Sequence, residues 1–159
     1  MFNISQLPVL SGLIGICPMP GRFSRYEINF EIILGWCPKL VITVAQFSEM
    51  ERIGIAEFTN DLKAKGIGWM HFPVADYGVP EINPDGWGNI SSQAHKILNA
   101  GGRVLCHCHA GCGRSGMVLL RLMCETGETA SDALARLRKI RSCAIETEAQ
   151  RVWATQINR

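Results

Sequence analysis

The sequence lacks the features that mark membrane, secreted and nucleic-acid-binding proteins. No stretch reaches about 18 consecutive apolar residues, so we expect no membrane-spanning helix. The first residues carry neither the basic start nor the cleavage pattern of a secretion signal. Charged residues make up only 19% of the chain, the net charge is +2, and no long run of lysine and arginine occurs. We therefore expect neither a nucleic acid nor a membrane as a partner.

Internal repeats, low-complexity segments and linkers are also missing. The 159 residues are 47% hydrophobic, which is typical of a globular chain with a sizeable core. We therefore predict a single domain over residues 1–159, monomeric and located in the cytoplasm.

The seven cysteines are an odd number, and no secretion signal accompanies them. Reduced thiols in a cytosolic compartment are the simplest interpretation. The most crowded group consists of Cys106, Cys108 and Cys112 with His107 and His109. This group has no second ligand pair at zinc-finger spacing, so we predict no metal and no cofactor.

Apolar runs and turn residues alternate along the chain. Compact apolar runs predict strands at 12–17, 40–44, 69–74 and around Val104, and 4–7 is a candidate hairpin partner for 12–17. Helical spacing and glycine stops predict helices at 24–34, 53–65, 90–98, 115–125 and 131–141. This alternation predicts an α/β fold with a central, mostly parallel sheet flanked by helices. Ligands of such sheets bind beyond the carboxyl ends of the strands.

The richest segment is CHCHAGCGRSG, which runs from Cys106 to Gly116. It lies between an apolar run that predicts a strand and another that predicts a buried helix. A strand–loop–helix layout of this kind places backbone N–H groups around an anion at a helix N-terminus. Its glycines permit the tight turns that the loop needs. The predicted phosphate-binding residues are His109, Ala110, Gly111, Cys112, Gly113 and Arg114.

Cys108 and Arg114 stand at the two ends of this loop. Arg114 can hold two phosphate oxygens in a bidentate fork. Cys108 would lie beneath the phosphorus, where the loop amides and the helix N-terminus favour the thiolate. A thiolate in that position is a nucleophile for in-line attack. The Ser115 hydroxyl can donate a hydrogen bond to the sulfur and help it leave in the second half-reaction.

The pattern Cys-x5-Arg-Ser, with His107 before the cysteine, resembles the signature loop of the cysteine-based protein tyrosine phosphatases. The resemblance implies a protein tyrosine phosphatase-like (dual-specificity phosphatase) fold and a phosphocysteine intermediate. We interpret His107 as a residue that orients the loop and donates toward the thiolate. The alternative is a chance Cys-x5-Arg around an inert buried thiol. The glycines, Ser115 and the strand–loop–helix context argue against it.

A phosphatase needs a general acid for the leaving group. Asp76 lies where a predicted strand enters a loop rich in glycine and proline, as mobile catalytic loops often do. Enzymes with this signature carry their acid in such a segment at a similar distance before the nucleophile, so the resemblance favours Asp76. Asp85, deeper in the loop, is the rival. An ordinary turn beginning at Asp76 is the plainer alternative.

The segment AIETEAQ at 144–150 resembles the glutamine-bearing segment that positions water in several such enzymes. The resemblance implies that Gln150 orients the water that hydrolyses the phosphocysteine, with Asp76 then acting as the base. An ordinary helix start with acidic residues in its first turn is compatible with the same sequence.

Together with CPMPG at 17–21 and FPVADYGVPE at 72–81, these motifs resemble the small dual-specificity phosphatases of the kinase-associated phosphatase type. The resemblance implies hydrolysis of phosphotyrosine, and of phosphoserine and phosphothreonine, on a phosphorylated protein or peptide. Lipid and inositol phosphatases place lysines where this loop has His109 and Cys112, which disfavours a phosphoinositide or another small phosphate ester without excluding it. A sulfurtransferase or arsenate reductase-like thiolate enzyme and a binding-only pseudophosphatase are further alternatives.

Two further cysteines lie close to the expected nucleophile in the sequence. A neighbouring thiol can rescue oxidised Cys108 as a disulfide, and Cys112 or Cys106 is the candidate. The plainer role for Cys112 is that of a small residue lining the loop.

Overall fold

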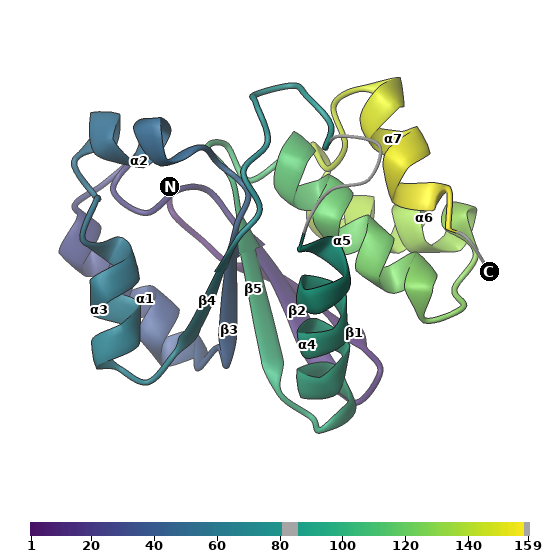
Figure 1. The fold of residues 1–159 in the computed structure, drawn as a ribbon, viewed down its shortest axis with the longest axis horizontal. Helices are drawn as coiled ribbons and strands as arrows, with labels where there is room; N and C mark the ends of the chain where they lie inside the picture. The colour runs from purple at the N-terminus through teal and green to yellow at the C-terminus, as the bar shows by residue number, and fades with distance from the viewer. Residues whose placement is uncertain (81–85, 158–159) are drawn as a thin grey trace.

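The computed structural model describes residues 1–80 and 86–157, and it is built on a five-stranded sheet in the order β1-β2-β5-β3-β4. The strands are β1 Ser5–Val9, β2 Gly12–Cys17, β3 Leu40–Thr43, β4 Gly68–His71 and β5 Arg103–His107. β1 pairs antiparallel with β2, and the remaining pairs are parallel. Figure 1 shows the sheet between two groups of helices. The predicted α/β fold with a mostly parallel sheet is confirmed.

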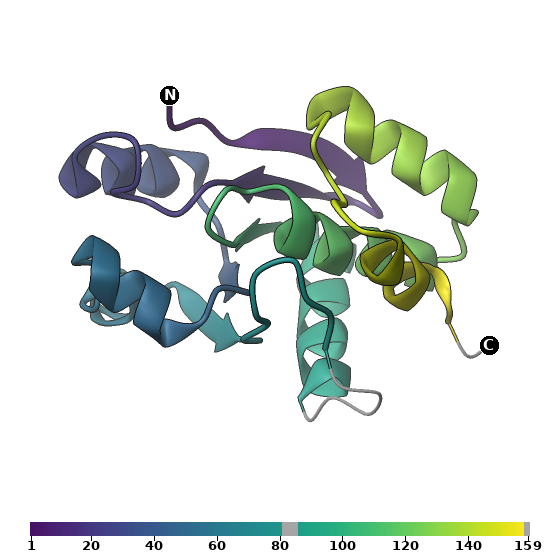
Figure 2. The same ribbon diagram turned by 90° about the horizontal axis from the view of Figure 1, so that it is seen from above.

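Seven helices lie among the described residues. They are α1 Tyr26–Trp36, α2 Phe47–Ile53, α3 Phe58–Ala64, α4 Trp87–Asn99, α5 Gly113–Glu125, α6 Ala130–Ile140 and α7 Glu148–Thr155. α1, α2 and α3 cover one face of the sheet, and α4, α5, α6 and α7 lie on the other side (Figures 1 and 2). In that part of the chain, no helix combines the length and the apolarity needed to cross a membrane.

Two buried clusters hold these helices to the sheet because side chains of a strand point alternately to its two faces. In β5, Val104 and Cys106 join the cluster with α4, α5 and α6, while Leu105 joins the cluster with α1, α2 and α3. α5 is the most buried of the described helices, with residues 113–120 and 122–124 all buried. Its rigid packing fixes the loop that precedes it.

The helix predicted at 53–65 begins too early, because α3 spans only Phe58–Ala64, and the preceding helix α2, Phe47–Ile53, is not predicted at all. Gly54 has a φ of +87° and ends α2, with its N–H bonded to the carbonyls of Met50 and Glu51. The left-handed conformation that glycine adopts readily stops the helix.

The other boundaries differ by smaller amounts. The hairpin strand predicted at 4–7 extends through Pro8 to Val9, which an edge strand tolerates because its outer N–H groups need no partner. α1 begins at Tyr26, and Ser24 accepts a side-chain hydrogen bond from Asn29 instead of capping the helix. The predictions at 90–98, 115–125 and 131–141 correspond to α4, α5 and α6.

The carboxyl ends of the four parallel strands point to one edge of the sheet, where the segments that follow them meet. The Met19 N–H donates to His109 O across two of these segments, at 3.1 Å, and Val44 N–H donates to His107 O at 2.9 Å. The loop after β5 therefore lies in the middle of the edge at which α/β sheets bind ligands.

Candidate active site

The segment between β5 and α5 forms a tight loop from Cys108 to Cys112, as its glycines predict. Gly111 has a φ of +71°, and a Cβ there would lie 2.5 Å from the Cys17 carbonyl carbon, so both conformation and space require glycine. The amides of Arg114 and Ser115 stand in the first turn of α5, where no helical acceptor exists. The loop thus ends at the N-terminus of a buried helix, which favours an anion.

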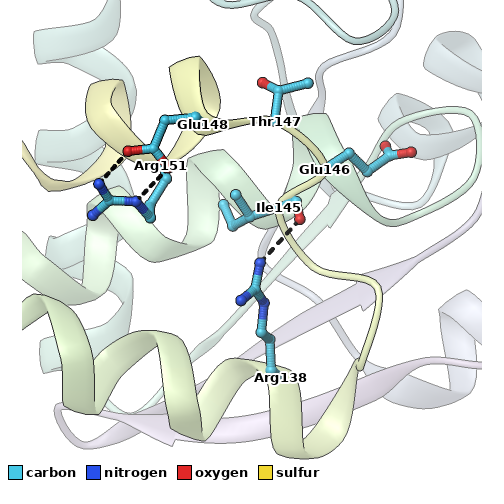
Figure 3. Close-up of a pocket in the computed structure, with 6 residues that line it drawn as sticks. All are labelled: Arg138, Ile145, Glu146, Thr147, Glu148 and Arg151. Carbon is cyan, nitrogen blue, oxygen red and sulfur yellow. Dashed lines mark hydrogen bonds and ion pairs between the residues drawn. The ribbon is translucent and has the colours of Figure 1, made fainter.

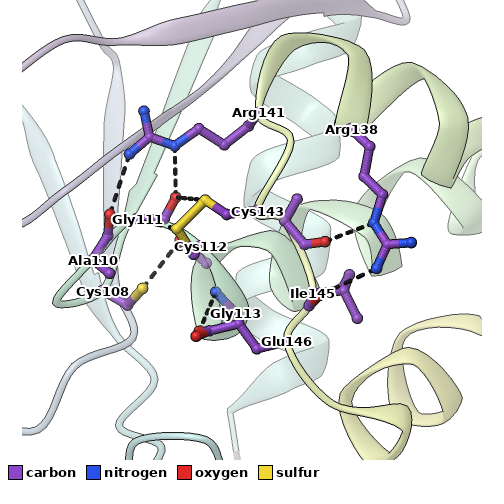
Figure 4. The surroundings of a disulfide bond; sticks show 12 residues. Cys108, Ala110, Gly111, Cys112, Gly113, Arg138, Arg141, Cys143, Ile145 and Glu146 are labelled. Carbon is purple, nitrogen blue, oxygen red and sulfur yellow. Dashed lines mark hydrogen bonds between the residues drawn. A yellow bond between two sulfur atoms is a disulfide. The ribbon is translucent and has the colours of Figure 1, made fainter.

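Two arginines hold the loop carbonyls on its outer side. Arg22 Nη1 donates to His109 O at 3.2 Å, and Arg141 donates from Nε to Gly111 O at 2.8 Å and from Nη2 to Ala110 O at 3.2 Å. Figure 4 shows Arg141 bridging the latter two carbonyls. In a trans peptide the N–H points opposite to the C=O. The amides that follow these carbonyls therefore point into the loop, where they can bind phosphate oxygens.

Cys108 lies at the base of this loop and contacts Ser115. Its Sγ is 3.2 Å from Ser115 Oγ, and both side chains are buried. Burial raises the pKa of the neighbouring thiols Cys17 and Cys106, despite a lowering effect of Arg141 at Cys17. These two cysteines remain protonated and unreactive. The structure thus brings together the predicted nucleophile and the predicted hydroxyl donor.

Arg114 is the largest fully buried side chain, and Glu49 of α2 binds it in a bidentate ion pair. Arg114 Nη1 is 2.7 Å from Glu49 Oε2 and 2.9 Å from Val74 O, and Nη2 is 2.8 Å from Glu49 Oε1. Within residues 1–80 and 86–157, Arg114 Nε is buried without a hydrogen-bond partner. The ion pair fixes the plane of the guanidinium, and Nε remains available to an incoming oxygen.

Glu49 is a site residue that the sequence analysis missed. Burial alone would raise the pKa of its carboxyl, but the hydrogen bonds from Arg114 and the Gln46 N–H outweigh it and lower the pKa. Gln46 and Glu49 form the capping box of α2, a spacing that is visible in the sequence. That spacing predicts the start of a helix, not a partner 65 residues away.

Asp76 lies beside Arg114, which is where a general acid must stand to reach the leaving group of a bound phosphate ester. Its Oδ1 is 3.3 Å from Arg114 Nη2, and its side chain is 55% exposed. The next residue, Tyr77, has a φ of +59° and donates its N–H to Asp76 Oδ1 at 3.0 Å. A solvent-facing carboxyl at the mouth of the loop is placed to meet a leaving group. Asp85, the rival, lies outside the described residues.

His107 does not point its ring at the nucleophile's sulfur. Its Nδ1 is 3.0 Å from Cys108 O, and its Nε2 is 2.7 Å from Thr43 Oγ1, which accepts a hydrogen bond from Trp69 Nε1. A neutral ring protonated on Nδ1 satisfies this chain, with the Thr43 hydroxyl donating to Nε2. The expected donation toward the thiolate is corrected: the ring holds the Cys108 backbone instead.

Gln150 is fully buried at the start of α7, and both ends of its amide make hydrogen bonds. Its Oε1 accepts from the N–H groups of Glu146 at 2.9 Å and Thr147 at 3.3 Å, and its Nε2 donates to Gly78 O at 3.2 Å. It therefore ties the Asp76 loop to the segment that leads into α7. Its water-positioning role stays a prediction.

Glu146 is a second residue that the sequence analysis did not assign to the site. Its Oε1 accepts from the Gly113 N–H at 2.8 Å, so a carboxylate occupies one amide of the phosphate loop. Glu146 also lines a hollow of about 220 Å³, shown in Figure 3, whose other lining residues are Arg138, Ile145, Thr147, Glu148 and Arg151. In the sequence it looks like an ordinary acidic residue just before a helix.

The cysteine pairing differs from the two expectations, which were reduced thiols throughout and a disulfide between Cys108 and Cys112 or Cys106. Cys112 forms a disulfide with Cys143, 31 residues later, and their Cα atoms are 5.1 Å apart (Figure 4). The expectation of reduced thiols throughout is therefore wrong. Cys106 and Cys108 carry no disulfide, so neither proposed partner of Cys108 is bonded to it. No spacing rule in the sequence marks Cys143.

A buried cysteine beneath inward-facing amides, with a buried arginine at the far end, defines a cysteine-dependent phosphatase of the protein tyrosine and dual-specificity type. A family model described as a DSP-PTPase phosphatase of polymorphic toxin systems matches residues 39–128. The chain belongs to this family.

Comparison with individual proteins gives the same class. Cyclin-dependent kinase inhibitor 3 of Rattus norvegicus is 27% identical over 157 residues, which cover 91% of this chain and 73% of the relative. A structure of kinase-associated phosphatase with its catalytic-site cysteine replaced by serine matches 96% of this chain and 92% of its own, with a TM-score of 0.84 and 23% identity. A structure of PTPMT1 in complex with PI(5)P covers 95% and 92%, with a TM-score of 0.76 and 18% identity. The two structures establish the shared fold.

Proposed function

We propose that this phosphatase hydrolyses phosphate monoesters on proteins or peptides through a phosphocysteine at Cys108. The observation that carries the proposal is the buried Cys108–Ser115 contact of 3.2 Å beneath a loop whose amides point inward. Arg114 stands in the first turn of α5, directly after the loop, and its Nε is unpartnered within the described residues. Together they hold a tetrahedral anion with its phosphorus above the sulfur.

The first half-reaction transfers the phosphoryl group to the enzyme. The Cys108 thiolate attacks phosphorus in line with the ester oxygen, and the S–P bond forms as the P–O bond breaks. Asp76 donates a proton to the departing oxygen, because its carboxyl is the exposed acid beside Arg114. The loop amides stabilise the charge that develops on the equatorial oxygens.

The second half-reaction releases inorganic phosphate. A water attacks the phosphocysteine, Asp76 accepts its proton, and the sulfur leaves as a thiolate. Ser115 donates a hydrogen bond to that sulfur from 3.2 Å. Gln150 holds the water, with its amide turned from the Gly78 carbonyl.

Support for a protein substrate comes from the relatives. The matching curated relative is named a cyclin-dependent kinase inhibitor and the structure a kinase-associated phosphatase. The family description adds a polymorphic toxin system as the setting. The loop also has no lysine to bind a second phosphate. The PI(5)P complex of PTPMT1 makes a phosphoinositide the second candidate substrate.

Turnover of p-nitrophenyl phosphate tests the chemistry. We expect no turnover by Cys108→Ser and a fall in kcat of roughly 10²- to 10⁴-fold for Asp76→Ala. Cys37→Ser and Asp132→Ala, which change exposed residues outside the site, serve as matched controls and should retain the wild-type rate. A wild-type rate for Cys108→Ser would rule out the mechanism.

Substrate class is tested with phosphotyrosine, phosphoserine and phosphothreonine peptides beside inositol polyphosphate and PI(5)P. We expect the peptides to have the higher kcat/KM. Strong turnover of the inositol compounds with none of the peptides would overturn the protein assignment and leave the phosphocysteine chemistry intact.

A further inference from the structure

Residues 141–146, here called the brace segment, are attached to the phosphate loop at several points. Arg141 binds the carbonyls of Ala110 and Gly111, and Glu146 accepts from the Gly113 N–H. The Ile145 N–H reaches Cys112 O at 3.4 Å. The Cys112–Cys143 disulfide adds a covalent link in the middle of these contacts (Figure 4).

The two sulfurs of this disulfide differ in exposure and surroundings. Cys143 is exposed, whereas Cys112 is half-buried in the loop and is the N-cap residue of the 13-residue helix α5. Because Cys143 is the more exposed residue of the two, we expect an external thiolate to attack its sulfur first. The departing Cys112 thiolate would form at a helix N-terminus, where negative charge is stabilised. The geometry thus favours one direction of opening.

We propose that the Cys112–Cys143 disulfide is a reducible clamp on the phosphate loop, and that phosphate binds more weakly once a dithiol has opened it. The proposal rests on the proposed function only in requiring that this loop binds phosphate. With a clamp of this kind, the site binds phosphate most tightly under oxidising conditions, in which the disulfide is formed.

The opening reaction balances as two thiol–disulfide exchanges. One thiolate of a dithiol attacks the Cys143 sulfur, the S–S bond breaks, and the electron pair leaves with Cys112. The second thiolate of the reductant then attacks the mixed disulfide and releases Cys143. The protein disulfide is reduced to two thiols, and the dithiol is oxidised to its cyclic disulfide.

Opening the clamp changes the loop in two ways that both oppose phosphate. The covalent limit on loop motion is lost, so the amides are less preorganised and binding must order them. A thiol also replaces a neutral disulfide sulfur, and any thiolate at Cys112 competes with phosphate for the field of the α5 N-terminus. The hydrogen bonds from Arg141 and to Glu146 remain, so the loop stays folded and the effect falls on affinity.

Calorimetric titration of inorganic phosphate into Cys108→Ser protein tests the clamp. This background removes the nucleophile, so oxidation of Cys108 cannot confound the comparison. The protein is measured before and after anaerobic treatment with dithiothreitol and desalting, with the number of free thiols counted by alkylation and intact mass. We expect the phosphate dissociation constant to rise about two- to tenfold after reduction, as a loss of preorganisation predicts.

Two further variants in the same background separate the causes. Cys143→Ser leaves a free Cys112 thiol, whereas Cys112→Ser with Cys143→Ser leaves neither charge nor clamp. We expect both to bind phosphate more weakly than the oxidised protein and to ignore dithiothreitol, with Cys143→Ser the weaker of the two. Cys37→Ser should respond to dithiothreitol as the parent does.

Equal dissociation constants before and after verified reduction would overturn the clamp. So would an air-oxidised protein in which Cys112 and Cys143 both remain alkylatable. If the wild type fails to turn over any phosphate ester but its phosphate affinity still falls on reduction, the catalytic proposal fails and the clamp stands.

Discussion

Glu49 and Arg114 meet in a two-point ion pair, with Oε2–Nη1 at 2.7 Å and Oε1–Nη2 at 2.8 Å. The side chain of Arg114 is 1% exposed and that of Glu49 is 11% exposed. Because the pair uses both terminal nitrogens, only Nε of Arg114 is left without a partner in the described part of the chain. Glu49 thus decides how the arginine faces the phosphate loop, although it comes from a helix on the opposite side of the sheet.

Glu49→Ala should weaken substrate binding and destabilise the fold. It leaves a buried guanidinium with the Val74 carbonyl and the more distant Asp76, and breaking a buried pair is costly. We expect a loss of about 3–5 kcal/mol in the free energy of unfolding, measured by urea titration. The KM for p-nitrophenyl phosphate should rise roughly tenfold, as for the loss of a charge-assisted contact.

Two variants sharpen that comparison. Glu49→Gln keeps the shape and one acceptor, so its KM should fall between those of the wild type and Glu49→Ala. Glu51→Ala changes an exposed carboxylate on the same helix and should leave both quantities unchanged. An unaltered KM in Glu49→Ala would show that Arg114 needs no partner to face the substrate.

The buried ring of His107 should make stability depend on acid. Burial lowers the pKa of His107 to about 4, although the hydrogen bond to the Cys108 carbonyl acts in the opposite direction. In the unfolded chain the His107 ring therefore becomes protonated near pH 6.5, whereas in the folded chain it becomes protonated only near pH 4. The free energy of unfolding contributed by this ring is present above pH 6.5 and is lost as the pH falls to about 4, by roughly 3 kcal/mol.

Urea titrations between pH 6.5 and 4 check whether the free energy of unfolding falls as the pH falls. His107→Asn, whose amide can replace Nδ1 as a donor to Cys108 O, should lower stability at pH 7 and flatten its fall between pH 6.5 and 4. Ser92→Ala, which changes an exposed residue of α4 away from the loop, is the control and should keep the wild-type slope. A slope that His107→Asn leaves intact would assign the acid sensitivity to other groups.

The parts of the fold that could be predicted are those that a short continuous stretch of sequence specifies. The strand, the loop glycines and the apolar helix lie within residues 103–125, so one continuous segment specifies the phosphate loop. α2 and the later start of α3 were not predicted, since one glycine such as Gly54 can either end or interrupt a helix.

The site residues that could not be predicted from the sequence escape for a different reason. Glu49 lies 65 residues from Arg114, and Cys143 lies 31 residues from Cys112, so only the folded chain brings each pair together. Neither residue carries a local signature of its partner. Asp76, by contrast, could be predicted because the family resemblance places the acid in a strand-to-loop segment at a similar distance before the nucleophile.

A substitution of Gln150 can distinguish a role in hydrolysis of the phosphocysteine from a role in holding the fold together. If it positions the attacking water, Gln150→Ala should slow the second half-reaction alone, so kcat should fall by about 10- to 100-fold, as for a lost catalytic contact. Phosphocysteine should accumulate, visible as a burst of p-nitrophenol and as a phosphate adduct in the intact mass. The variant also removes the acceptor for the Glu146 and Thr147 N–H groups, so some destabilisation is expected.

Thr147→Ala supplies the matched control. It removes the other half of the same capping box, because Thr147 Oγ1 accepts from the Gln150 N–H at 3.1 Å, yet it leaves the amide in place. A lost N-cap costs about 1 kcal/mol. We therefore expect Thr147→Ala to lower the free energy of unfolding without a burst. If Gln150→Ala behaves in the same way, with a matching kcat and no accumulated adduct, the residue holds the Asp76 loop to α7 and does not act on water.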